Sequence, residues 1–255
     1  MMGKHHAVSG AAAWVAVTST APFTLGLAPL PRASVLIGTA CTAGAALLLD
    51  SDHHSSTFAR SGGAVTRVIA TAAEGLSGGH RHGLHSLPAV AALTVGTAFV
   101  GRWFTVVPYL GRIPAGSALV FLVLVALMMK VIGLQRRGIV ALWVSAAILV
   151  LGVLRFAPEE MAWLPLSVLI GSIVHLLGDA LTTAGIPLLW PWVPEPPELW
   201  SDTPVLNAIW KSNGYMAVPI LGDAGSTRET VLFVAMSLYT VYALLATTGA
   251  LAAIA

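Results

Sequence analysis

The chain has very little charge. Only 9% of its 255 residues are Asp, Glu, Lys or Arg, whereas a soluble globular domain carries about 25%. Hydrophobic residues make up 56% of the chain, and its mean hydropathy is +0.83. So few charges could not cover the surface of a water-soluble protein. The composition therefore excludes an ordinary soluble domain and predicts an integral membrane protein whose excess apolar surface faces lipid.

Cysteine and net charge are also scarce. The single cysteine, Cys41, stands in an apolar run, which excludes a disulfide framework. The formal net charge is only +2, and a nucleic-acid-binding domain usually shows a strong basic excess. The lipid bilayer is therefore the expected partner, and direct binding of nucleic acid is not expected.

The apolar runs predict an all-α, polytopic transmembrane bundle that forms a single domain over residues 1–255. A span needs roughly 20 apolar residues, and about seven segments reach or approach that length: 11–30, 33–49, 87–101, 116–134, 139–154, 162–182 and 230–253. Segment 64–73 is too short and contains Arg67, so we expect a short interfacial helix there.

The distribution of basic residues sets the expected orientation. With the N-terminus in the cytoplasm, nine of the 13 Lys and Arg residues fall on the cytoplasmic side, as the positive-inside rule requires. Segment 186–229 would then be a cytoplasmic or interfacial loop. Its four tryptophans suit the headgroup level of a membrane. The loop could lie on the membrane surface, act as a lid for an amphipathic substrate, or dock a protein partner.

The sixth predicted span carries two ionisable residues. His175 and Asp179 are four residues apart, so they share one helix face, and Thr182 continues that face. Ionisable groups at membrane depth are costly and usually mark a functional site. The alternative is a structural pair that only satisfies itself.

Two further clusters lie on the same predicted side of the membrane. Asp50, Asp52 and His53 offer oxygen and nitrogen donors, a mixture that suits Zn, Mn or Fe. Farther along, Arg81 could hold an anionic oxygen such as phosphate, and His85 could reach a metal. Taken alone, each cluster could equally be a solvated polar turn. Seven of the eight histidines, His5 among them, fall in predicted cytoplasmic segments, and this common sidedness favours one shared metal site.

The order of these motifs resembles the YdjM-like membrane-bound metal-dependent hydrolases. The resemblance runs through Gly3-Lys4-His5, Leu48-Leu49-Asp50-Ser51-Asp52-His53, His80-Arg81, His85-Ser86-Leu87 and His175-Leu176-Leu177-Gly178-Asp179, and ends at Gly185-Ile186-Pro187-Leu188-Leu189-Trp190-Pro191. Two positions depart from the family pattern: Leu49 replaces a frequent proline, and Leu84 stands where a threonine is usual.

The resemblance implies a multi-pass protein of the inner (plasma) membrane with metal-dependent hydrolase activity. It also implies that the family's polar signature corresponds to His5, Asp50, Asp52, His85, His175 and Asp179. These six are our candidate metal ligands, for one or two divalent ions, with Zn preferred over Mn or Fe. One family member is described as binding the LexA repressor.

We therefore expect a hydrolase that acts on an amphipathic, lipid-like phosphoester at the cytoplasmic interface. Asp52 would serve as general base, and Arg81 would bind the substrate anion. A non-catalytic scaffold that recruits a cytoplasmic protein is the main alternative. A metal or proton transporter is less favoured, because polar residues concentrate on one side instead of lining the whole membrane depth.

Overall fold

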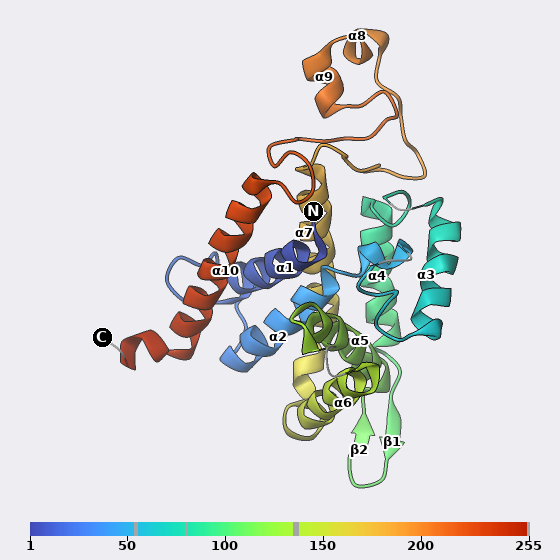
Figure 1. Cartoon of the computed structure of the whole chain (residues 1–255). Coiled ribbons are helices and arrows are strands. Elements are labelled where there is room, and N and C mark those ends of the chain that lie inside the picture. The colour runs from blue at the N-terminus through green and yellow to red at the C-terminus, as the bar shows by residue number, and fades with distance from the viewer. Residues whose placement is uncertain (54–55, 80, 135–137, 254–255) are drawn as a thin grey trace.

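The computed structural model describes residues 1–53, 56–79, 81–134 and 138–253, and it is mostly helical (Figure 1). The α-helices are α1 (Gly3–Thr18), α2 (Arg32–Ala45), α3 (Ala64–Ser77), α4 (Leu87–Val100), α5 (Ala115–Val131), α6 (Ile139–Phe156), α7 (Leu164–Ala180), α8 (Glu198–Ser201), α9 (Pro204–Ile209) and α10 (Thr227–Thr248). Short 3-10 helices are η1 (Leu49–Asp52), η3 (Pro158–Met161) and η4 (Ala250–Ala253).

Four helical segments of the described residues are long and apolar enough to cross a membrane. They are Arg32–Asp52, Ile139–Phe156, Pro158–Ala180 and Thr227–Thr248. They coincide with four of the predicted spans. Two other predicted spans correspond to the shorter apolar helices α4 and α5. The expectation of a helical membrane protein is confirmed, whereas the count of seven spans is not.

The first helix lies elsewhere than predicted. The expected span over 11–30 is replaced by α1, which begins at Gly3 and ends at Thr18. The chain then runs irregularly to Pro31, with Phe23 and Gly26 both at positive φ. Pro22 and Pro29 cannot continue a helix, because proline lacks the amide hydrogen and clashes with the preceding turn. Because α1 already begins at Gly3, His5 and His6 lie within this helix and not in a segment before it.

The core is built by α1, α2, α5, α6 and α7, and small residues let these helices approach closely. A Cβ added at Gly44 of α2 would lie 1.9 Å from the Leu124 carbonyl oxygen of α5. A Cβ added at Gly171 of α7 would lie 2.7 Å from Ala45 of α2. Such small-residue contacts are typical of membrane helix packing. They hold the end of α2, and therefore η1, against α7.

The two ends of the molecule differ in structure. At one end, strands β1 (Thr105–Val107) and β2 (Gly111–Ile113) form an antiparallel hairpin, a small departure from the all-α prediction (Figure 1). At the opposite end, α8 and α9 form a small lobe beyond the last residue of α7, and the N-terminus lies near that helix end (Figure 1).

The segment between α7 and α10 leaves α7, forms this lobe and returns. The amide of Val218 donates to the Ala180 carbonyl at 2.6 Å, and the amide of Met216 donates to the Ile186 carbonyl at 2.9 Å. Apart from α8 and α9 the described backbone of this segment is irregular, as expected for the loop predicted over 186–229. The part of this segment that returns from the lobe, around Met216 and Val218, therefore covers one side of the end of α7.

The short helix predicted at 64–73 is present as α3. Thr66, Ala70 and Ser77 are buried, whereas Val65, Val68 and Leu76 are exposed. An amphipathic helix with an exposed apolar face suits the surface of a membrane. Because α3 packs on η1, it lies beside the segment that carries Asp50 and Asp52.

Candidate metal centre

Four separate segments bring their polar side chains to one place near the end of α7. The start of α1 contributes His6, η1 contributes Asp50, the segment before α4 contributes His85, and α7 contributes His175 and Asp179. The structure therefore brings together four of the six candidate ligands, Asp50, His85, His175 and Asp179.

Two histidine nitrogens lie close together, and one carboxylate oxygen each of Asp50 and Asp179 lies at a similar distance from both of them. The Nε2 atoms of His85 and His175 are 3.2 Å apart. Asp50 Oδ1 lies 3.6 Å from the His85 nitrogen and 3.7 Å from the His175 nitrogen. Asp179 Oδ2 lies 3.5 Å from each of the two nitrogens.

These five separations match those between the ligands of a zinc ion. Zinc bonds of 2.0–2.2 Å to nitrogen and oxygen place the ligands about 3.3–3.6 Å from one another. The five separations range from 3.2 to 3.7 Å. Two imidazoles and two carboxylates are also donors that Zn, Mn and Fe accept. The residues present therefore fit a divalent metal ion.

A hydrogen bond on the side of the ring away from the cluster fixes the orientation of His175. Its Nδ1 donates a hydrogen bond to the Ala46 carbonyl oxygen at 2.6 Å. Ala46 lies just past the end of α2, at the helix contact described above. This hydrogen bond leaves the Nε2 lone pair directed into the cluster, as is usual for a histidine that binds metal.

His85 is backed by a carboxylate in a similar way. Its Nδ1 lies 3.4 Å from Asp52 Oδ2, and both side chains are fully buried. Burial alone would lower the pKa of His85, but its hydrogen bonds with Asp50 and Asp52 and the charges of these carboxylates raise that pKa to about 9. Asp52 therefore lies behind a candidate ligand and not among the four facing donors.

The other carboxylate oxygen of Asp179, Oδ1, contacts two cationic groups. Arg81 Nη2 donates to Asp179 Oδ1 at 2.8 Å, and the amino group of Met1 forms an ion pair with the same oxygen. Arg81 Nη1 also lies 3.5 Å from Thr182 Oγ1. The side chains of Asp50 and Arg81 are 21% and 19% exposed, whereas those of His85, His175 and Asp179 are at most 1% exposed. The cluster is therefore open on the side where Asp50 and Arg81 lie.

Sequence reasoning missed His6. Its ring stacks on that of His175 with centroids 3.7 Å apart, and its Nε2 lies 3.3 Å from Asp179 Oδ1. His6 is fully buried, yet neither ring nitrogen has a hydrogen bond with any part of the chain that the structure describes. His6, His175 and Asp179 thus form a second group of donors that could hold an ion. Which of the two adjacent histidines faces α7 depends on the rotation of α1 about its axis, and the pattern of apolar residues does not indicate that rotation.

His5, the predicted ligand, has a different partner. Its Nδ1 is hydrogen-bonded to Glu229 Oε1 of α10, and both side chains are buried. The other oxygen of Glu229 accepts from the Gly225 amide at 2.7 Å. Ser226 caps α10 by accepting from the Glu229 amide. The expectation that His5 joins the Asp50 and His175 cluster is corrected, because a neighbouring helix position turns His6 toward it.

The remaining histidines of the predicted clusters lie farther out. His53 follows η1 and is half-buried. His82 is exposed, and its Nδ1 lies 3.1 Å from the hydroxyl of Tyr215. His54 and His80 lie outside the described residues.

The comparisons with known proteins agree with the motif order. A family model described as YdjM inner membrane protein matches residues 1–250, nearly the whole chain. No curated protein and no solved structure matches the chain.

Proposed function

We propose that this chain, which belongs to the YdjM inner membrane protein family, is a metal-dependent hydrolase that acts on an amphipathic, lipid-like phosphoester. The observation that carries the proposal is the convergence of the two imidazole nitrogens with carboxylate oxygens of Asp50 and Asp179, which lie 3.5 to 3.7 Å from those nitrogens. Two imidazole nitrogens and two carboxylate oxygens are donors that a divalent cation accepts.

His85, His175, Asp50 and Asp179 would hold the ion, with His6 as a further donor beside Asp179. A bound divalent ion supplies Lewis acidity at neutral pH, which polarises a phosphoryl or carbonyl group. Zinc suits a site of this size with two nitrogen and two oxygen donors, and Mn or Fe would accept the same donors. The additional group formed by His6, His175 and Asp179 leaves room for one or two ions.

The residues around the donors have separate tasks in this proposal. Asp52 orients His85 through Nδ1, in the way a carboxylate commonly supports a metal-binding histidine. Arg81 keeps Asp179 in place with one nitrogen and has further N–H donors for a substrate anion. Asp50 is the most exposed carboxylate of the cluster, so it is the carboxylate best placed to take a proton from a reacting group at the open side.

The position of the cluster supports an amphipathic substrate. Asp50 and Asp52 lie at the end of the apolar segment Arg32–Asp52, and Asp179 lies at the end of the apolar segment Pro158–Ala180. The donors therefore lie where spans end, at the depth of lipid headgroups. By the positive-inside rule this end would face the cytoplasm, together with the N-terminus.

The direct test is the metal content of detergent-purified protein, measured by mass spectrometry. Wild-type protein should carry near-stoichiometric metal, and the double variant His175→Ala with Asp179→Ala should carry none. Asp50→Asn, which changes a partly exposed side chain, should reduce the content as well. The variant His82→Ala removes an exposed histidine outside the cluster and should keep the metal. Metal-free wild type that is folded and was never exposed to chelator would contradict the proposal.

A scaffold function has one observation in its favour. The lobe formed by α8 and α9 exposes Leu199 and Val205, both more than 70% accessible, and exposed apolar side chains often mark contact sites. A scaffold should still recruit its protein partner when His175 and Asp179 are replaced. Hydrolysis of a phosphoester should be lost in the same variant, so the two functions are separable.

A further inference from the structure

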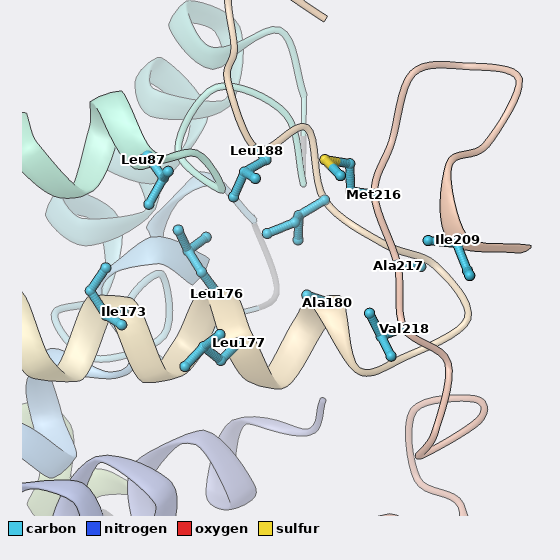
Figure 2. Close-up of a pocket in the computed structure, with 11 residues that line it drawn as sticks. Leu87, Ile173, Leu176, Leu177, Ala180, Leu188, Ile209, Met216, Ala217 and Val218 are labelled. Carbon is cyan, nitrogen blue, oxygen red and sulfur yellow. The ribbon is translucent and has the colours of Figure 1, made fainter. Parts of the chain in front are cut away.

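An apolar groove runs along the face of α7 that points away from His175 and Asp179. Ile173, Leu176, Leu177 and Ala180 form one wall. Leu188, which precedes the lobe, and Met216, which follows it, lie opposite (Figure 2). The groove has a volume of about 250 Å³, and every side chain that lines it is apolar. Because successive residues of a helix turn by about 100°, Leu177 points about 160° away from both His175 and Asp179, whereas Leu176 lies between that direction and the metal donors.

The groove is open at its rim and closed on its inner side. Leu177 and Met216 are 57% and 41% exposed at its rim. Leu176 and Ile186 are buried and pack with Leu49 and Val90, which separates the groove from Asp50 and His85. The amide of Leu87 donates to the Leu188 carbonyl at 2.9 Å and ties the loop to the start of α4. The groove is thus a separate space beside the candidate metal centre.

The chemistry of the groove restricts what it can bind. A sugar or a nucleobase would need polar groups to fix its orientation, and none lines the groove. A hydrocarbon chain needs no polar partner and buries only apolar surface against these side chains.

The direction of the groove matches a lipid whose headgroup lies at the cluster. Ala180 directly follows Asp179, and Ile173 lies seven residues earlier, about 10 Å farther along the helix into the span. Arg81 reaches Thr182, just past the end of α7. A lipid that lies along α7 therefore places its anionic group near Arg81 and its chain between Ala180 and Ile173.

We propose that this groove binds a hydrocarbon chain of the lipid-like substrate, so that the chain and the headgroup are recognised at the same end of α7 on different faces. This inference rests on the proposed function for its choice of substrate. It assigns to the segment between α7 and α10, through Leu188 and Met216, the task of holding the hydrocarbon chain.

Photolabelling tests the groove directly. The full-length protein is reconstituted in phosphatidylglycerol vesicles that contain a phosphatidic acid analogue with a diazirine in its acyl chain, and labelled peptides are identified by mass spectrometry. We expect label on α7 near Leu177 and on the segment around Met216. Leu177→Trp should fill the groove and remove most of this label, whereas Leu169→Trp, an exposed position on the same helix outside the groove, should not.

The outcomes separate this proposal from the proposed function. Label spread evenly over the exposed helices, unchanged by Leu177→Trp and by Val218→Trp at the opposite wall, would overturn the groove. Metal content measured on the same samples reports on the cluster alone. A protein that keeps its metal but shows no groove label would retain the hydrolase proposal and lose this one.

Discussion

Two neighbouring histidines at the start of α1 have different surroundings. His5 points to α10, where the carboxylate of Glu229 satisfies its Nδ1 in a buried pair. His6 points to α7, where it stacks on His175 and approaches Asp179 with no hydrogen bond to either nitrogen among the described residues. Nε2 of His5 also has no hydrogen bond among the described residues, so the two histidines differ chiefly in their neighbours: Glu229 for His5, and His175 with Asp179 for His6. The comparison teaches that burial alone does not identify a candidate ligand, and that the groups facing the buried ring must be compared.

The sharpest way to test this comparison is to replace each of the two histidines in turn. His6→Gln should weaken metal binding about 10- to 100-fold, because His6 stacks on His175 and lies beside Asp179, two of the proposed ligands. His5→Gln should leave metal binding unchanged but lower the free energy of unfolding by about 1.5–3 kcal/mol, as expected for a buried hydrogen bond to a charged group. Chelator competition and thermal unfolding measure the two effects. Equal loss of metal in both variants would remove the distinction.

The next largest effect concerns the residue behind His85. Asp52→Asn keeps the shape of the side chain but weakens its support of the His85 ring, so metal affinity should fall about 10- to 100-fold. Asp202→Asn, a change at an exposed position outside the cluster, serves as the control. If Asp52 were instead a base that only takes a proton during the reaction, its variant would bind metal normally and lose only turnover.

A smaller effect follows from the raised pKa of His85. In metal-free protein below about pH 9 the ring is protonated, and metal binding must release that proton. The apparent metal affinity should therefore rise about tenfold for each pH unit between 7 and 9 and then level off. Proton release on metal addition, followed in weakly buffered solution, measures it. An affinity independent of pH in this range would show that His85 is not a ligand.

The same shift affects the stability of the metal-free protein. Because the folded-state pKa lies above the ordinary value of 6.5, the stabilisation is fully present below pH 6.5 and is lost as the pH rises through about 9. His85→Gln should remove this pH dependence, which thermal unfolding of metal-free samples over pH 6 to 10 would record.

The smallest effect is expected at Arg81. Arg81→Lys keeps the charge but loses the forked donor that reaches both Asp179 and Thr182. Loss of one hydrogen bond near Asp179 should weaken metal binding by about 2- to 10-fold. Substrate binding should suffer more than metal binding, so a rise in KM with little change in metal content is the expected signature. Unchanged KM would exclude Arg81 from anion binding.

Much of the fold class and most of the cluster could be predicted from the sequence. Low charge and long apolar runs indicate a helical membrane protein, and the spacing of His175 and Asp179 places both on one face of α7. The start of the first helix could not be predicted, because two adjacent histidines before an apolar run look like a solvated terminus. Their burial depends on Glu229 and Asp179, which lie more than 170 residues away.

The choice between His5 and His6 depends on the rotation of α1 about its axis. That rotation is fixed by close contacts such as Gly10 against α2, where an added Cβ would lie 2.5 Å from the Thr42 carbonyl oxygen. Such contacts are invisible in the pattern of apolar residues. The apolar groove was likewise beyond prediction, because its walls come from α7 and from an irregular segment whose path is set by hydrogen bonds at Ala180 and Ile186.

X-ray absorption spectroscopy of protein loaded with one equivalent of zinc tests the central claim most directly. The account predicts a first shell of nitrogen and oxygen at about 2.0–2.2 Å, with outer scattering from at least two imidazole rings that is reduced in His175→Ala. A sulfur ligand, or a shell without imidazole that is identical in wild type and His175→Ala, would contradict it.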